Sequence, residues 1–121
     1  PEQVAQAREK AFRAPLLMLL VVDTACGDAD IDLHERLISA GCAVQNMLLM
    51  ATAQGYGSAL TSGKALKAAS LRALFRLSAC EQALCFISIG TVLSRKAARA
   101  RPMAGTYVST LDADRGVVPG F

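Results

Sequence analysis

Side chains that could carry out catalysis are few in this chain of 121 residues. The single histidine, His34, stands beside Glu35 at the start of an expected helix, where a surface position is favoured over a catalytic one. Ser39 and Cys42 have no neighbouring base that would make either a nucleophile. No two carboxylates have a spacing typical of acid–base catalysis. The sequence therefore predicts a binding site and no catalytic residue.

Two segments could bind a ligand. Thr61 and Ser62 stand directly before an expected helix, where backbone N–H groups favour an electron-rich partner, although Ser62 could simply cap that helix. The second segment, residues 95–101, is basic, and the guanidinium groups of Arg99 and Arg101 suit bidentate recognition of phosphate. A solvated basic loop is the alternative. Nucleic acid is a poor partner, because no aromatic residues alternate with these charges.

The remaining composition excludes several classes of protein. The four cysteines form no C-x-x-C pair, and with one histidine a zinc site is hard to assemble. We expect buried free thiols in a reducing cytoplasm. Residues 37–63 carry no formal charge, but polar residues and glycines interrupt them and no aromatic belt flanks them. A helix buried in a soluble protein, with no membrane partner, fits this stretch best.

Helices and strands must alternate to position these segments. Hydrophobic periodicity and Gly or Pro boundaries predict helices over residues 2–11, 33–54 and 64–77. Apolar runs predict strands over residues 16–22, 58–61 and 83–89. An edge strand over residues 106–111 and a loose tail over residues 112–121 are expected after them. This order predicts a single α+β domain over residues 1–121. The helix over 33–54 is apolar nearly all round, which indicates burial, most easily under a second subunit.

Three blocks in this order resemble the C-terminal part of the small FMN-dependent nitroreductase family. They are Phe12–Leu17 before an apolar strand, residues 39–63 with the turn Gly55–Gly57, and Phe86–Thr91. The resemblance covers roughly residues 5 to 110, and the second block is the most specific. It implies a three-layer α/β/α fold with a mixed sheet, and a long central helix at the interface of a homodimer.

The resemblance also implies an activity and a site. Members of the family pass electrons from NAD(P)H through FMN to nitroaromatic or quinone-like acceptors. Leu60, Thr61 and Ser62 match the flavin contacts of the family, and Arg99 or Arg101 matches the basic residue that reaches the FMN phosphate. The turn at Gly57 would let the backbone approach the flavin ring.

The sequence also departs from the family pattern. Leu60 takes the place of an aromatic residue, and the family's basic N-terminal segment, which holds the flavin phosphate, would lie before Pro1. The alternative interpretation is therefore a truncated or degenerate relative without flavin activity, which acts as a dimeric scaffold or binds another small ligand.

Overall fold

Helices and strands alternate along most of the chain, as expected for an α+β fold. The computed structural model describes residues 2–94 and 97–120. In order, its elements are α1 (Glu2–Ala11), β1 (Leu16–Asp23), α2 (Leu33–Ala53), β2 (Gly57–Thr61), the 3₁₀ helix η1 (Lys64–Lys67), α3 (Ala69–Leu74), β3 (Glu81–Gly90), the 3₁₀ helix η2 (Ala104–Thr106), β4 (Ser109–Asp112) and β5 (Gly116–Pro119). The predicted fold class is confirmed.

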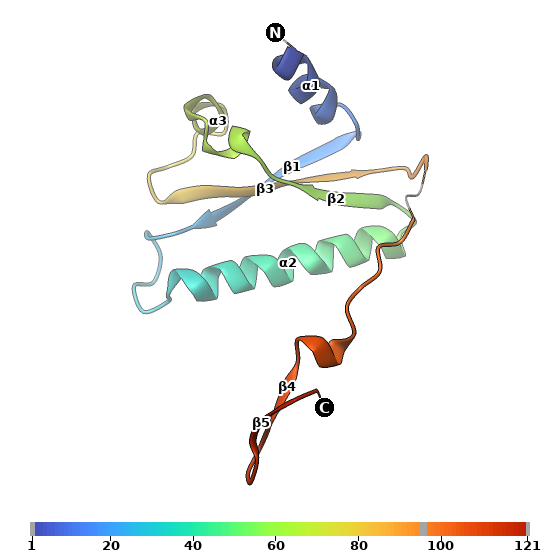
Figure 1. Ribbon diagram of the computed structural model, residues 1–121. Helices are drawn as coiled ribbons and strands as arrows, with labels where there is room; N and C mark the ends of the chain where they lie inside the picture. The colour runs from blue at the N-terminus through green and yellow to red at the C-terminus, as the bar shows by residue number, and fades with distance from the viewer. Residues whose placement is uncertain (1, 95–96, 121) are drawn as a thin grey trace.

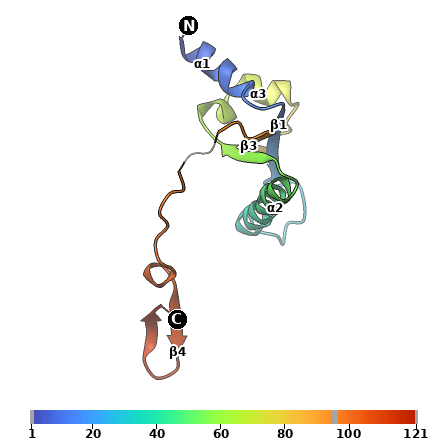
Figure 2. The same cartoon turned by 90° about the vertical axis from the view of Figure 1, so that its right-hand side faces the viewer.

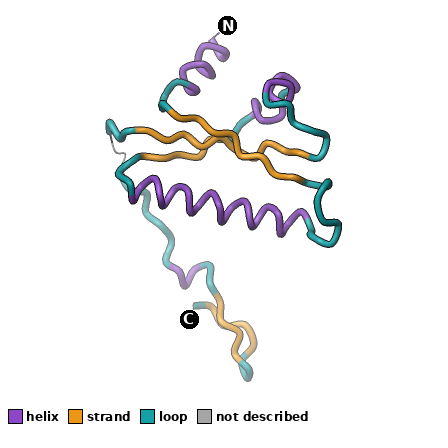
Figure 3. The backbone as a smooth tube through the Cα atoms, turned by 180° about the vertical axis from the view of Figure 1, so that it is seen from behind, coloured by secondary structure: helices purple, strands orange, loops and turns teal. Residues whose placement is uncertain are grey.

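Strand β3 lies at the centre of a three-stranded sheet of order β1-β3-β2 (Figures 1 and 3). It pairs antiparallel with both neighbours, so this sheet is antiparallel and not the mixed sheet that the resemblance implied. Its Ser88 stands opposite Leu17 of β1 and Ala59 of β2. Its Phe86 stands opposite Thr61 of β2. Because strand side chains alternate between faces, these residues share one face of the sheet.

Helices cover both faces of this sheet. The long helix α2 runs along one face, whereas α1 and α3 lie on the other, so that the sheet is the middle of three layers (Figures 1 and 2). The three-layer α/β/α architecture expected from the sequence is therefore present. The two helical layers differ greatly in length, since α2 has 21 residues and α3 has six.

The core lies mainly between α2 and the sheet, and it is small. Ile87 of β3, at 1% exposure, is the most deeply buried large side chain described. On α2, Val44 and Ala51 are buried, and their separation of two helical turns puts them on one face. Within a single chain α2 is covered on one face only, because Ile38 is 67% exposed and Met50 58% exposed. The expected burial of its other face by a second subunit stays a prediction. Among the residues that the structure describes, no helix is long and apolar enough to cross a bilayer.

The end of α2 is fixed by a glycine, as the sequence predicts. Gly55 has φ of +83°, a left-handed conformation that glycine adopts without a steric penalty. Its N–H donates to Thr52 O at 3.0 Å, and the N–H of Tyr56 donates to Ala51 O at 2.8 Å. This pair of bonds is a Schellman cap, which satisfies the last carbonyls of the helix and turns the chain into β2.

The helix predicted over residues 64–77 is wrong as one continuous element. Ala68 is extended (φ −75°, ψ 135°), and it separates η1 from α3. The break lets Leu71 become buried, and it lets the guanidinium of Arg72 donate to the carbonyls of Ser78 and Glu81. The burial of Leu71 and the hydrogen bonds of Arg72 thus outweigh the helix propensity of the Ala-rich sequence.

The loose tail predicted over residues 112–121 is also wrong. Strands β4 and β5 form a hairpin that lies apart from the main sheet (Figures 1 and 2). At its turn, the side chain of Asp112 accepts the N–H groups of Asp114 and Arg115, and Gly116 has φ of +71°. These hydrogen bonds lower the pKa of Asp112. The side chain of Arg115 has the largest effect, and the N–H groups of Arg115 and Asp114 come next. An Asp side chain bonded to the backbone and a left-handed glycine are standard turn chemistry.

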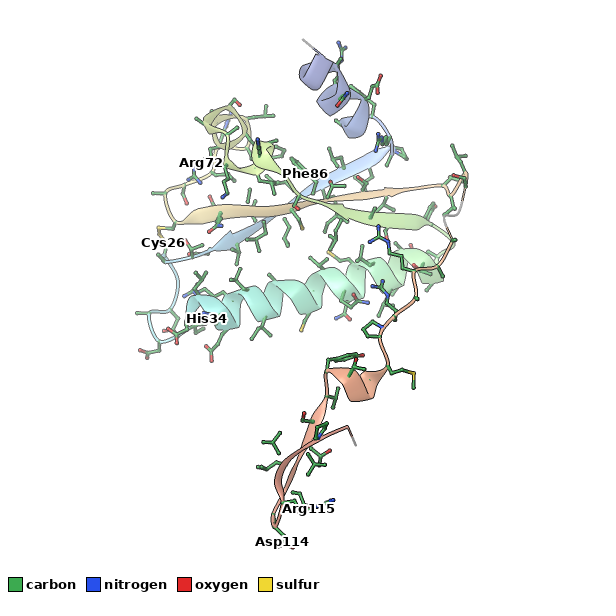
Figure 4. The ribbon with its side chains drawn as sticks, in the orientation of Figure 1. Cys26, His34, Arg72, Phe86, Asp114 and Arg115 are labelled. Atoms are coloured by element: carbon green, nitrogen blue, oxygen red, sulfur yellow. A yellow bond between two sulfur atoms is a disulfide. The ribbon has the colours of Figure 1, made fainter. Side chains whose placement is uncertain are left out.

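Two cysteines depart from the expectation of free, buried thiols. Cys26, in the loop after β1, and Cys80, directly before β3, form a disulfide with a Cα–Cα distance of 5.6 Å (Figure 4). The backbone beside it is held independently, because the N–H of Thr24 donates to Cys80 O at 2.7 Å. Cys42 is free but exposed, and Cys85 is free and half-buried. The register of β1 with β3 therefore brings the bonded pair together.

Candidate functional site

A cavity of about 1240 Å³ opens on the face of the sheet opposite α2. The sheet contributes Leu17, Phe86 and Ser88 to its wall, and Figure 4 labels Phe86 on this part of β3. Three other segments complete the wall of the cavity. They are the end of α1 with the residues that follow it, the chain from β2 into η1, and residues 90–94. The cavity thus collects segments that are far apart in the sequence around one face of three paired strands.

The lining of this cavity combines three kinds of side chain. Hydroxyl groups come from Ser58, Thr61, Ser62, Ser88, Thr91 and Ser94. Apolar surface comes chiefly from Leu17, Leu66 and Phe86. Arg13 and Lys64 are its charged members, and no Asp or Glu among the described residues lines it. Such a lining favours an anionic ligand that has both an apolar body and hydrogen-bonding groups.

The structure brings only part of the predicted flavin site together. Thr61 and Ser62 both line the cavity. Leu60 does not, because it stands opposite Ile87 and its side chain alternates to the α2 face. Arg99 and Arg101 are exposed and line neither of the two described cavities, and Arg95 and Lys96 lie outside the described residues.

The glycine expected to approach a flavin ring also packs closely against another residue. A Cβ at Gly57 would lie 2.6 Å from Cγ2 of Val92, and one at its strand partner Gly90 would lie 2.7 Å from Cδ of Pro15. Both glycines therefore permit close packing of the chain at one end of β2 and β3. Gly57 also lines the first cavity, so the close approach of its backbone to a flavin ring stays a prediction.

A second cavity, of about 710 Å³, lies on the opposite face of the sheet. It is bounded by the C-terminal half of α2, the start of β1 and the end of β3, with Met18, Met47, Met50 and Ile89 in its wall. Asn46 is among its few polar members. Without charged groups, this cavity is suited to apolar packing and not to an anion.

Groups with displaced pKa values lie outside both cavities. The N–H groups of Cys26 and Ala25 donate to Asp23, which lowers the pKa of its carboxyl, and Arg36 lies 4.0 Å away. Burial raises the pKa of the Cys85 thiol. Within the described parts of the chain, no group of three or more His, Cys, Asp or Glu residues could hold a metal ion. The first cavity therefore offers hydrogen bonds and positive charge, which suit binding and orientation.

Sequence reasoning missed Arg13 and Lys64 as members of the site. Arg13 stands within the first block, two residues before Pro15, and Lys64 directly follows the second block, after Gly63. In the sequence each is an isolated cation beside an expected helix, whereas residues 95–101 form a crowded basic segment. Only the tertiary arrangement shows that the isolated pair faces a common cavity.

Comparison with known proteins identifies relatives of the chain. A protein of Haemophilus influenzae, named as an NAD(P)H nitroreductase, is 30% identical over 94 residues, which are 78% of this chain and 51% of that protein. The protein of Escherichia coli K12 named as NAD(P)H nitroreductase YdjA is 32% identical over 88 residues, 73% of this chain and 48% of that protein. The chain thus spans about half the length of these curated relatives.

A solved structure supports the same fold. The crystal structure of a nitroreductase-like family protein from Bacillus cereus matches with a TM-score of 0.73 at 17% sequence identity, over 93% of this chain and 60% of that one. The sequence model of the Nitroreductase family matches residues 2–91, from α1 through β3 into the segment that closes the first cavity. The chain therefore belongs to the nitroreductase family.

Proposed function

We propose that this chain is part of an FMN-dependent oxidoreductase that takes electrons from NAD(P)H and reduces nitroaromatic or quinone-like acceptors. The observation that carries the proposal is the position of Thr61 and Ser62. These residues match the flavin contacts of the family, and both line the larger cavity. Membership of the family and the names of the relatives support the same reaction class.

The cavity fits the cofactor in chemical terms. Leu17, Leu66 and Phe86 offer an apolar wall for a planar ring, and the hydroxyls of Thr61 and Ser62 offer hydrogen bonds to its polar edge. When bound, FMN supplies the transfer of hydride and single electrons that the protein side chains cannot perform. The residues of the chain would orient the ring and limit its access to water. Leu60 would contribute through its backbone, since its side chain faces α2.

We also propose that the working form is a homodimer. Apolar side chains stand exposed on α2, where Ile38, Leu49 and Met50 are between 57% and 67% exposed. The β4–β5 hairpin, which lies apart from the main sheet, exposes Leu111 and Val117. Surfaces of this kind support a protein–protein interface, and a second copy of the chain is the partner that a symmetric assembly would use. Light scattering coupled to size-exclusion chromatography measures this directly.

An FMN titration tests the central proposal. We expect FMN fluorescence to be quenched on binding, and the loaded protein to oxidise NADH or NADPH when a nitroaromatic compound or a quinone is added. Thr61→Val and Ser62→Ala each remove one hydrogen-bonding group and should weaken FMN binding up to about tenfold. Ser70→Ala is the matched control, because Ser70 is exposed on α3 and does not line the cavity.

One outcome favours the alternative function. A stable dimer that binds no FMN would refute flavin chemistry for this chain and indicate a dimeric scaffold or a binder of another small ligand. The observation on the side of this alternative is that neither Arg99 nor Arg101, the residues expected to hold the phosphate, lines a described cavity.

A further inference from the structure

We propose that the disulfide between Cys26 and Cys80 is a reversible redox switch that controls how firmly residues 62–66 form their part of the wall of the first cavity. In the oxidised chain this wall is held in place and the cavity binds its ligand. In the reduced chain the wall opens more often, and binding is weaker. The inference goes beyond the proposed function, and only its binding measurement rests on that function.

The disulfide lies where a reductant can reach it. Cys26 is exposed in the loop after β1, and Cys80 is half-buried directly before β3. Exposed disulfides are reduced more readily than those enclosed in a core. A thiolate of an external dithiol attacks the sulfur of Cys26, the thiolate of Cys80 leaves, and the second thiol of the reagent then displaces Cys26 from the mixed disulfide. The protein gains two electrons and two protons as two thiols, and the reagent becomes a disulfide.

The backbone around the bond keeps the two sulfurs close after reduction. Thr24 donates its N–H and its hydroxyl to Cys80 O at 2.7 and 2.8 Å. The carboxylate of Asp23 accepts the N–H groups of Ala25 and Cys26 at 2.9 and 2.8 Å, which fixes the turn that carries Cys26. Because these hydrogen bonds do not depend on the disulfide, the thiols stay in position to be oxidised again. The bond can therefore open and close without loss of the register between β1 and β3.

A guanidinium connects the neighbourhood of the disulfide to α3. Arg72 donates to Ser78 O and, at 3.0 Å, to Glu81 O. These two acceptors stand on either side of Cys80 in the chain, and Figure 4 labels Arg72 and Cys26 at the same end of the sheet. A disulfide that immobilises Cys80 therefore also immobilises the acceptors. Free thiols leave them held by hydrogen bonds, of which those at Ser78 are exposed to water and contribute little.

The helix at the other end of this connection is thinly packed. Leu71 is the buried residue of α3, whereas Leu74 is 77% exposed and Phe75, directly after the helix, is 46% exposed. One residue, Ala68, separates α3 from η1, and η1 begins with Lys64 in the cavity wall. Elements with few buried apolar contacts open locally at a small cost in free energy. Loosening α3 at its disulfide end therefore loosens the cavity wall at its other end.

Hydrogen exchange followed by mass spectrometry tests the switch without any ligand, in oxidised wild type and in wild type reduced by dithiothreitol. Reduction should speed exchange about tenfold over residues 64–77, while the amides at the centre of β3 remain the slowest. Cys26→Ser/Cys80→Ser should exchange like reduced wild type and should not respond to the reductant. Cys42→Ser/Cys85→Ser is the matched control, because both of those thiols are free, and it should respond like wild type.

An FMN titration measures the coupling between the disulfide and the cavity. Reduced wild type should bind FMN about tenfold more weakly than oxidised wild type. By linkage, saturating FMN should raise by the same factor the ratio of reduced to oxidised dithiothreitol at which half of the disulfide is reduced. Arg72→Gln keeps the disulfide but removes the connection, so its FMN affinity should be low in both redox states. Arg76→Gln, at an exposed site, should behave like wild type.

Four results would overturn the inference. A disulfide that is reduced only in urea is a structural crosslink. Unchanged exchange over residues 64–77 on reduction removes the mobile wall, and loss of protection throughout β3 shows global unfolding in place of a local switch. Equal FMN affinities in the two redox states remove control of the cavity. If exchange changes as expected but oxidised wild type binds no FMN, the proposed function fails while the switch of the cavity wall stands.

Discussion

Replacing both Cys26 and Cys80 by serine should destabilise the fold by a predictable amount. Their disulfide joins residues 54 positions apart in the sequence. In the chain-entropy account, a crosslink over a loop of this length removes about 14 cal/mol/K from the unfolded chain, hence about 4 kcal/mol at 25 °C, or roughly a thousandfold in the unfolding equilibrium. The native backbone should persist, because Thr24 still donates its N–H and hydroxyl to Cys80 O at 2.7 and 2.8 Å.

Urea unfolding followed by circular dichroism, with and without a thiol reductant, measures this contribution. Oxidised wild type should unfold at the highest urea concentration, and reductant should lower its midpoint to that of Cys26→Ser/Cys80→Ser. The Cys42→Ser/Cys85→Ser variant is the control, because both of those thiols are free, and it should keep the full response to reductant. Equal midpoints for oxidised wild type and the Cys26/Cys80 variant would refute the reasoning.

The remaining predictions concern the core and the acid limit of stability. Ile87→Ala should cost about 2–5 kcal/mol in urea unfolding, because Ile87 is 1% exposed, whereas Ile38→Ala, at a site 67% exposed, should cost far less. The N–H groups of Cys26 and Ala25 hold the pKa of Asp23 below its ordinary value of 3.8. The Asp23 carboxylate therefore contributes fully to the free energy of unfolding above pH 3.8, the pKa of the unfolded chain. This contribution is lost as the pH falls through the lower pKa of the folded state. Asp23→Asn should unfold with a shallower pH dependence between about pH 4 and pH 2, and an unchanged slope would contradict this account.

Elements with a strong local signal could be predicted from the sequence. The apolar run after Pro15 gives β1, and the left-handed glycine at Gly55 gives the end of α2. The division of residues 64–77 could not be predicted, because Ala68 has no local reason to be extended. The break depends on the burial of Leu71 and on the bonds that Arg72 makes near the start of β3. These contacts exist only after the sheet has formed.

The candidate site follows the same division between local and tertiary information. Thr61 and Ser62 could be identified because their hydroxyls stand in a recognisable block just before η1. Arg13 could not, since the cavity joins it to Lys64 across 50 intervening residues of sequence. The disulfide was missed for the same reason. Cys26 and Cys80 form no short motif, and only the pairing of Asp23 with Glu81 places them side by side.

The register of β2 against β3 decides which side chains the cavity receives. With Thr61 opposite Phe86, Thr61 lines the cavity, whereas Leu60 lies on the α2 face of the sheet. A slip of one residue would exchange these faces and put Leu60 in the cavity wall in place of Thr61. The pairing of Gly57 with Gly90 opposes such a slip, because a side chain at either position would collide with Val92 or Pro15. The two glycines thus shape the cavity indirectly, by fixing the strand that brings Thr61 into its wall.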